Sequence, residues 1–285
     1  MLDNNSSFEA LLPPAMAEKA EQIGIKKANS DFWTLLVLGI LAGAFVALGA
    51  IFATAATAGT SSLPYGIVRL IMGLAFTVGL ILVIVGGAEL FTGNMLIIMA
   101  FASRKVSLGA LLRNWGIVYL GNFIGSIATA GAIFIGRQYE FGHGAMGLNM
   151  LSIGEAKTSL DFFQAVALGI LCNAVVCLAV WLTYSARTTT DKIMAIIPPI
   201  TAFVAAGFEH SVANMYFIPV ALLVKYGGSP TFFDAIQKTP ADFPHLTWGG
   251  FFLNNLLPVT IGNMIGGIVL VGLVYWFIYR RKALG

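Results

Sequence analysis

One short polar stretch, residues 207–215, has side chains that could carry chemistry, because it combines a carboxylate, an imidazole, a hydroxyl and an amide. The sequence on both sides of it is as apolar as a membrane-spanning helix. A charged side chain at that depth is costly unless it faces a cavity or a partner, so a functional role is expected. His210 is the only histidine in such a setting, since His143 and His245 lie in polar segments.

His210 could exchange a proton with a weak acid, because imidazole titrates near neutral pH. The alternative is a structural histidine that is hydrogen-bonded to a neighbouring helix. Glu209 could also carry a proton, but a structural role is favoured for it and for Glu89, its counterpart in the repeat described below. In that role each carboxylate would accept hydrogen bonds from N–H groups of unwound backbone.

The composition places the chain among proteins that cross a membrane several times. The chain is 58% hydrophobic and 10% charged, whereas an ordinary soluble domain has about 25% charged residues. Cys172 and Cys177 lie inside one apolar segment and are interpreted as small hydrophobic residues, so neither a disulfide nor a metal site is expected. The polar start has no apolar core of a cleaved signal peptide, and no nucleic-acid partner is indicated.

Six apolar segments are long enough to cross a bilayer, at about residues 32–56, 67–102, 111–134, 162–184, 193–224 and 251–279. The second and fifth are too long for one plain helix, and glycine and polar residues interrupt them near 86–94 and 207–215. Such interruptions predict discontinuous helices whose unwound part lines a cavity. Residues 137–161 are interpreted as a polar loop.

Lysine and arginine gather in the first thirty residues and in residues 104–113, 187–192 and 280–282. The positive-inside rule then puts both termini in the cytoplasm. The expected organisation is a cytoplasmic lead (residues 1–30), a transmembrane channel domain (31–280) and a cytoplasmic tail (281–285). Within the lead, residues 15–28 are interpreted either as a short surface helix or as part of a solvated tail.

The two halves of the membrane domain, residues 31–136 and 161–280, resemble each other at three places in the same order. Residues 38–48 correspond to 168–178, Gly87-x-Glu89-x-x-x-Gly93-Asn94 corresponds to Gly207-x-Glu209-x-x-x-Ala213-Asn214, and Gly121-Asn122-x-Ile124-Gly125 corresponds to Gly262-Asn263-x-Ile265-Gly266. A copy with three spans must be followed by an inverted copy. The expected fold class is therefore an all-α polytopic membrane protein with six transmembrane helices in a 3+3 inverted repeat, its second and fifth helices broken.

Two broken helices that meet near the midplane would make a weak anion site. The second half of each broken helix exposes backbone N–H groups at its positive dipole end. Uncharged side chains could add further donors: Thr92, Asn94, Asn173, Asn214 and Asn263. Neutral donors let a small anion lose water and still leave the site, as conduction requires.

Three motifs in this sequence resemble signatures of the formate–nitrite transporter family: residues 87–95 (Gly-Ala-Glu-Leu-Phe-Thr-Gly-Asn-Met), residues 207–215 (Gly-Phe-Glu-His-Ser-Val-Ala-Asn-Met) and residues 260–267 (Thr-Ile-Gly-Asn-Met-Ile-Gly-Gly). The resemblance covers nearly the whole chain. It implies an aquaporin-like protomer that assembles as a homopentamer in the lipid bilayer of a bacterial inner membrane. It also implies a channel, not an enzyme, that passes formate and similar small monovalent anions without a cofactor.

The same resemblance implies roles for individual residues. His210 matches the central pore histidine, and Thr92 belongs to the loop of the broken second helix. Asn173 and Asn263 match pore asparagines, and Lys157 matches a loop lysine that supports the histidine and attracts anions. Together with Glu89 and Glu209, these residues form the expected pore set.

Five apolar residues match the two constrictions of the family's pore. Phe76 and Phe203 match the periplasmic constriction, whereas Leu80, Leu90 and Phe91 match the constriction on the other side. Phenylalanine is common throughout this chain, so spacing alone favours packing against lipid or other helices for Phe76, Leu80, Phe91 and Phe203.

The sequence leaves the preferred anion open. Residues 8–17 and 275–281 are similar to formate channels, whereas the version of the first motif at residues 87–94 is more similar to nitrite channels. Nitrite, acetate, lactate or hydrosulfide could replace formate. The sequence also does not decide between passive conduction and proton symport, or whether residues 1–30 gate the pore.

Two unrelated classes of protein were weighed. A neutral-solute channel for water, glycerol or urea shares the broken-helix topology, but the paired Asn-Pro-Ala motif is absent from this sequence. A haem-binding redox subunit would need several histidines within its spans, and this chain has one.

Overall fold

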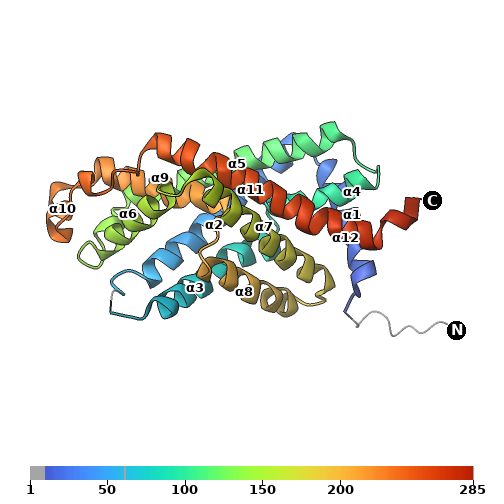
Figure 1. Cartoon of the computed structure of the whole chain (residues 1–285), viewed down its shortest axis with the longest axis horizontal. Helices are drawn as coiled ribbons and strands as arrows, with labels where there is room; N and C mark the ends of the chain where they lie inside the picture. Colours follow the sequence, from blue (N-terminus) through green and yellow to red (C-terminus); the bar gives the residue numbers. More distant parts are fainter. Residues whose placement is uncertain (1–9, 61, 285) are drawn as a thin grey trace.

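The computed structural model describes residues 10–60 and 62–284, and within these ranges it contains helices and no strand. Five helices there are long and apolar enough to cross a membrane (Figure 1): α2 (Phe32–Ala56), α3 (Tyr65–Gly86), α5 (Leu108–Ile135), α7 (Phe162–Ser185) and the continuous helix Gly250–Tyr279. The last one includes α11 (Leu257–Ile265), α12 (Val274–Tyr279) and two stretches of wider π-type turns.

The two breaks predicted in the second and fifth segments are confirmed. After α3, the chain continues through a 3₁₀ helix (Gly93–Ile97) and the short helix α4 (Ile98–Ala102). The fifth segment is divided into α8 (Thr189–Ala205) and α9 (Ser211–Gly227). Gly87 and Gly207 stand at the breaks with φ of 82° and 79°, a left-handed conformation that glycine adopts without a steric penalty.

The prediction of a polar loop at residues 137–161 is wrong over much of its length, because α6 (Ala145–Thr158) lies there. The helix is short and mixes glycines with polar residues, so its apolar face is weak in the sequence. Its buried residues Met146, Met150 and Leu151 nevertheless have helical spacing. A second short helix, α10 (Pro230–Ile236), lies in the later polar segment.

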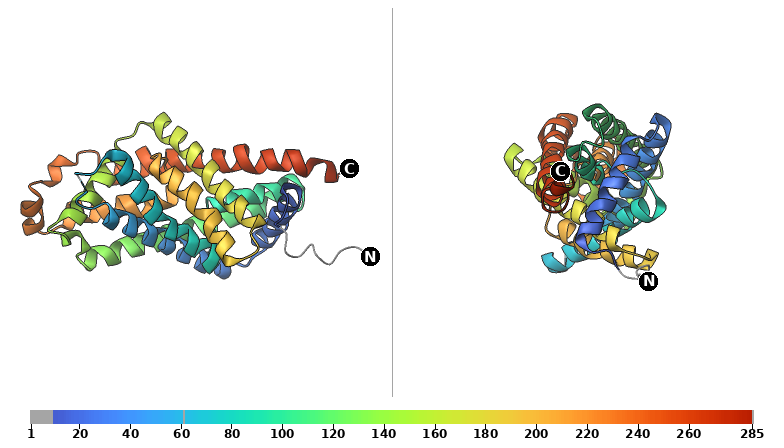
Figure 2. Two further views of the ribbon diagram at one scale, coloured as in Figure 1. Left: turned by 90° about the horizontal axis from the view of Figure 1, so that it is seen from below. Right: turned by 90° about the vertical axis from the view of Figure 1, so that its right-hand side faces the viewer.

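The first helix, α1 (Pro13–Ala28), is a packed element of the protein and not part of a solvated tail. Ala17, Ala20, Glu21 and Ala28 are buried, and the helix lies against the 3₁₀ helix Gly93–Ile97 and against α4. Residues 1–9 of the predicted lead and residue 285 of the predicted tail lie outside the described residues. Both ends of the described chain lie at the same end of the molecule (Figure 2).

One close helix crossing occurs twice, once in each half of the chain. α2 packs against α5, and α7 packs against α11. A Cβ atom on Gly125 would lie 2.0 Å from the carbonyl oxygen of Ile40, and one on Gly266 would lie 2.1 Å from that of Ile170. Only glycine allows backbones to approach this closely. The predicted correspondence between the halves is therefore visible in their packing.

Candidate functional site

His210 occupies the N-terminus of α9 and is fixed by two hydrogen bonds. Its Nδ1 accepts a hydrogen bond from the backbone N–H of Ala213 at 3.1 Å, and its Nε2 lies 2.9 Å from Oγ1 of Thr92. A ring nitrogen that accepts an N–H bond carries no proton, so in the neutral ring the proton is on Nε2. Nε2 therefore donates to Thr92, whose own hydroxyl hydrogen is left to donate to a further acceptor. Both side chains are buried.

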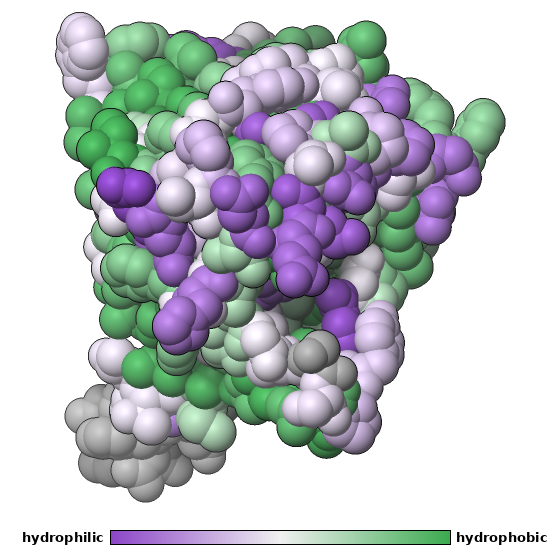
Figure 3. Space-filling model, turned by 90° about the vertical axis from the view of Figure 1, so that its left-hand side faces the viewer, coloured by the Kyte–Doolittle hydropathy of each residue, from purple (hydrophilic) through white to green (hydrophobic). Residues whose placement is uncertain are grey.

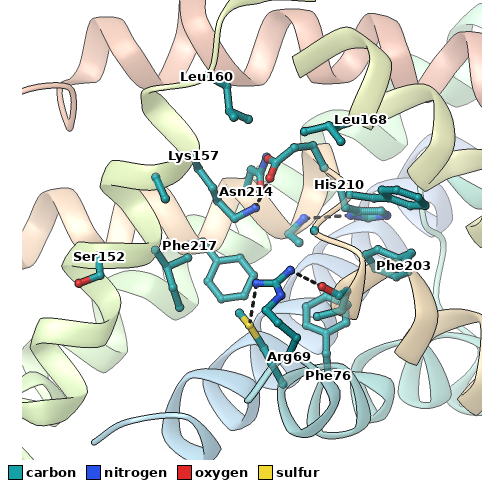
Figure 4. Close-up of a pocket in the computed structure, with 18 of the residues that line it drawn as sticks. Arg69, Phe76, Ser152, Lys157, Leu160, Leu168, Phe203, His210, Asn214 and Phe217 are labelled. Carbon is teal, nitrogen blue, oxygen red and sulfur yellow. Dashed lines mark hydrogen bonds and ion pairs between the residues drawn. The ribbon is translucent and has the colours of Figure 1, made fainter. Parts of the chain in front are cut away.

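Aromatic rings surround one side of this histidine. The ring centre of Phe203 lies 6.0 Å from that of His210. Phe76 meets Phe203 edge to face at 5.8 Å and stacks against Phe217 at 6.3 Å. The structure thus brings the predicted pair Phe76 and Phe203 together beside the histidine, and it adds Phe217, which the sequence did not single out (Figure 4).

A cavity of about 350 Å³ opens beside these residues, and we call it the α6-side cavity. It is lined by His210, the three phenylalanines and the charged side chains of Arg69, Lys157 and Glu209. The space-filling view of this end of the molecule shows hydrophilic residues gathered on this face (Figure 3). Positively charged and aromatic side chains therefore share the wall of this cavity.

Lys157 lies in the last turn of α6 and not in a loop, which corrects the position expected for it. Its Nζ pairs with Oε1 of Glu209 at 2.8 Å and lies 5.5 Å from the ring centre of Phe217. The exposed fractions of the two paired side chains are 15% and 7%. Lys157 therefore contacts the carboxylate that precedes His210, and no hydrogen bond joins it to the histidine among the described residues.

Glu209 is the centre of a small network of polar side chains. Its Oε2 accepts hydrogen bonds from the amides of Asn214 at 2.7 Å and Asn255 at 3.3 Å. Asn255 also donates to the carbonyl oxygen of Lys157 at 2.8 Å. The expected structural role fits this geometry, but the donors to the carboxylate are side chains, whereas backbone N–H groups were expected.

The same network is repeated around Glu89. Its Oε2 accepts from Lys27 at 3.0 Å and from Asn94 at 2.7 Å. Asn94 donates to Asn114, and Asn114 donates to the carbonyl oxygen of Lys27 at 3.0 Å. The two halves thus use four corresponding residues in corresponding contacts.

The sequence contains two signals for these networks that the predictions above did not use. Asn114 and Asn122 are eight residues apart, as are Asn255 and Asn263. Gly24-x-x-Lys27-x-x-x-Asp31 likewise matches Gly154-x-x-Lys157-x-x-x-Asp161. The correspondence between the halves therefore includes α1 and α6, which precede the boundaries assigned to the repeats.

Asn263 holds the loop in front of α9. Its amide group donates to the carbonyl oxygens of Gly169 at 2.8 Å and Glu209 at 2.9 Å, while its Oδ1 accepts from the N–H of Ser211 at 2.8 Å. Asn122 makes the corresponding bonds in the first half. Both donors of the Asn263 side chain are therefore used within the protein, and none is left for a passing anion.

Asn173 is also occupied, because its amide donates to the carbonyl oxygens of Asn263 at 2.7 Å and Thr92 at 3.2 Å. The side chain is fully buried and positions the Thr92 backbone. The geometry therefore gives Asn173 and Asn263 the role of positioning the two loops. Thr92 and His210 are the predicted pore residues whose hydrogen bond joins these loops directly.

A second cavity of about 280 Å³, which we call the α1-side cavity, lies on the other side of the broken helices. Leu80, Leu90 and Glu89 line it together with Lys27. Phe91, the third member of the predicted constriction, is placed elsewhere. Its ring centre lies 4.7 Å from that of Tyr119, and it lines a separate apolar cavity with Tyr119.

Within residues 10–60 and 62–284, no group of three or more His, Cys, Asp or Glu side chains could hold a metal ion. Cys172 and Cys177 are both free and buried.

Comparisons with known proteins agree on one family. The sequence profile described as formate/nitrite transporter matches residues 14–277. The chain is 44% identical to the formate channel FocA of Escherichia coli (strain K12), over 98% of both chains. It is 39% identical to the formate channel FocA of Haemophilus influenzae, over 93% of this chain and 94% of that protein.

Two solved structures have the same fold. A pentameric formate channel with formate bound superposes with a TM-score of 0.84 at 44% identity, covering 87% of this chain and 97% of the other. An ion channel of the same family superposes with a TM-score of 0.77 at 28% identity, covering 93% and 98%.

Proposed function

Because this chain belongs to the formate/nitrite transporter family, we propose that it is a channel that carries formate and similar small monovalent anions across a membrane. The observation that carries this proposal is the pair of cavities on opposite sides of the His210–Thr92 hydrogen bond. Each cavity has a lysine–glutamate pair in its wall, and each is lined in part by apolar side chains. No chemical conversion of the solute is proposed.

The proposed path begins at Lys157, in the wall of the α6-side cavity. An anion drawn there by positive charge passes Phe76 and Phe203 and loses part of its water. The hydroxyl of Thr92 then donates a hydrogen bond to it, supported by the bond that Thr92 accepts from His210. Leu80 and Leu90 form the apolar passage toward the α1-side cavity.

Proton coupling through His210 is limited by the bond from Ala213. A second proton on the ring must bind at Nδ1, where the Ala213 N–H now points. We infer that the neutral His210–Thr92 pair is the resting state and that proton transfer to formate requires the bond at Nδ1 to open. Protonated formate would then cross the apolar passage as the neutral acid, whereas the anion depends on hydrogen-bond donors.

The chain is a multi-pass membrane protein, and large apolar side chains are exposed along α2, α3, α5 and α7, as contact with lipid requires. We propose a bacterial inner membrane, both termini in the cytoplasm, and a homopentamer with one pore in each protomer. We also propose that residues 31–136 and 161–280 form inverted repeats preceded by the lead 1–30, with residues 281–285 as a tail. The inversion is supported by α1 and α6, which correspond in sequence and lie at opposite ends of the molecule (Figure 1).

Formate flux into liposomes that contain the purified protein tests the function. Flux above that of empty liposomes is expected, and its absence would contradict the proposal. Nitrite, acetate, lactate and hydrosulfide, added as competitors in separate experiments, then rank the anions. Osmotic swelling in glycerol without formate flux would instead indicate a neutral-solute channel.

A further inference from the structure

The α1-side cavity carries more positive charge than the α6-side cavity. Its wall contains Lys19, Lys27 and Lys192 with Glu89 as its only acid, which gives a formal charge of +2. The wall of the α6-side cavity contains two cations and one carboxylate, which gives +1. The excess comes from residues outside the repeated network, because Lys27 is already paired with Glu89 at 3.0 Å.

The excess lysines have no acidic partner in the described part of the chain. The Nζ of Lys19 donates to the carbonyl oxygen of Tyr184 at 2.8 Å, which is a neutral partner. The side chain of Lys192 forms neither a hydrogen bond nor an ion pair within the described ranges. Lys19 and Lys192 both line the α1-side cavity. Burial, followed by repulsion from Lys192 and Arg187, lowers the pKa of Lys19.

The position of Lys192 is also unfavourable for the stability of its own helix. Lys192 is in the first turn of α8, which begins at Thr189. A positive charge near a helix N-terminus is repelled by the helix dipole, usually by a few tenths of a kcal/mol. The helix dipole therefore does not account for a lysine here, and the positive-inside rule calls only for basic residues on this side of the membrane, not for their placement in a cavity wall.

We propose that Lys19 and Lys192 form an anion-binding site in the α1-side cavity, which takes the carboxylate of the transported monocarboxylate before it reaches the broken helices. Apolar side chains of Val83, Ile84 and Val180 make up the wall beside the lysines, so a small carboxylate can bind its oxygens to ammonium groups with its carbon against that wall. This inference rests on the proposed function and extends it, because the two mouths of the pore then differ in affinity for their substrate.

The site has a kinetic consequence that depends on direction. Positive charge in a cleft raises the local concentration of an anion, and salt screens this effect. Formate entering from the α1 side should therefore reach half-maximal flux at a lower concentration than formate entering from the α6 side. The advantage should shrink as ionic strength rises.

The test measures formate flux from each side in proteoliposomes whose orientation is known from protease cleavage of a terminal tag. The double variant Lys19→Gln/Lys192→Gln is expected to raise the half-saturating formate concentration about threefold or more from the α1 side. Flux from the α6 side should be unchanged. Lys26→Gln is the matched control, because Lys26 is exposed on α1 and lines neither cavity.

Three results would overturn the site. The double variant could leave the half-saturating concentration unchanged from both sides, or change it equally from both, or Lys26→Gln could produce the same shift. Inorganic phosphate is the further probe. If phosphate inhibits the wild type but not the double variant, and the two proteins have the same half-saturating formate concentration, the lysines bind an anion that is not transported. Absence of formate flux in the wild type would contradict the proposed function itself, whereas wild-type flux without an effect of the lysines contradicts only this site.

Discussion

His210 caps its own helix, since its Nδ1 accepts the N–H of Ala213, the third residue after it, at 3.1 Å. The cap decides which ring nitrogen carries the proton, and so it decides that Thr92 receives a hydrogen bond from the ring. One side chain therefore serves both the start of α9 and the donor set of the proposed pore. Substitutions that separate these two roles can test them.

His210→Asn should keep the cap and lose the donor. Asparagine is among the best N-cap residues, so the variant should unfold at nearly the wild-type temperature. His210→Phe loses the cap as well, at a cost of about 1 kcal/mol. Both variants should lower formate flux and flatten its dependence on pH, because neither side chain can take up a proton as imidazole does. If His210→Phe leaves the pH dependence and selectivity of the flux unchanged, the proton relay is wrong.

Glu209→Ala should destabilise the protein by about 3 kcal/mol, because it leaves Lys157 largely buried without a partner and removes the acceptor for Asn214 and Asn255. Glu209→Gln should cost less, since its amide oxygen can still accept from both asparagines. Thermal unfolding of the detergent-solubilised protein measures both effects. Equal losses of stability for the two variants would contradict the expectation that the glutamine amide oxygen still accepts hydrogen bonds from both asparagines.

The breaks in the second and fifth segments could be predicted because glycine and polar residues interrupt runs that are otherwise apolar. The partners of Glu89 and Glu209 could not be chosen in the same way. Lys27 is one of many charged residues in the first thirty, and its contact with Glu89 spans 62 positions along the chain. Only the match between Gly24-x-x-Lys27 and Gly154-x-x-Lys157 indicated that α1 belongs to the repeated architecture.

Asn173 and Asn263 show a second limit of the sequence. An asparagine in an apolar span predicts a polar contact, but its type and spacing do not tell whether it faces a solute or the backbone. The structure answers this with the distances from each amide nitrogen to two carbonyl oxygens. Phe91 shows the same limit for apolar residues, because it adjoins Leu90 in sequence and lines a different cavity.

Asn263→Ala and Asn122→Ala should destabilise the protein by similar amounts, since each removes three buried hydrogen bonds in corresponding places. We expect about 3 kcal/mol for each, given about 1 kcal/mol for each hydrogen bond lost. Asn263→Ala should also reduce formate flux, because the loop that carries His210 loses its clamp. A large loss of stability in one variant and none in the other would show that the two asparagines do not stabilise their loops equally.

Glu21 should make stability sensitive to acid. Burial raises the pKa of this carboxyl, but hydrogen bonds from Arg280, Lys105 and Ser103 lower it by more than burial raises it. The pKa of Glu21 therefore lies below its ordinary value. Because the folded pKa lies below the unfolded one, this stabilisation is complete above about pH 5 and is lost as pH falls through the folded pKa. From pH 7 to about pH 4 the unfolding temperature of the wild type should fall more than that of Glu21→Gln.

The matched control for this effect is Glu18→Gln, because Glu18 is exposed on the same helix one turn earlier. It should behave like the wild type over the whole pH range. A parallel loss of stability in the wild type and in Glu21→Gln would show that other carboxylates dominate acid unfolding. In that case the link from α1 to Arg280 would contribute little to stability.

Gly125→Ala should be strongly destabilising, whereas Gly131→Ala in the same helix should not. A Cβ at Gly125 would lie 2.0 Å from the carbonyl oxygen of Ile40, so α2 and α5 would have to separate, while one at Gly131 would meet no atom within 4 Å. Forcing atoms into a packed contact typically costs about 1 to 3 kcal/mol, and a backbone neighbour that cannot rotate away puts Gly125→Ala at the upper end. Alanine at position 131 should instead gain about 0.5 to 1 kcal/mol of helix propensity. Thermal unfolding and formate flux of the two variants measure the difference, and similar behaviour would contradict the close crossing of α2 and α5.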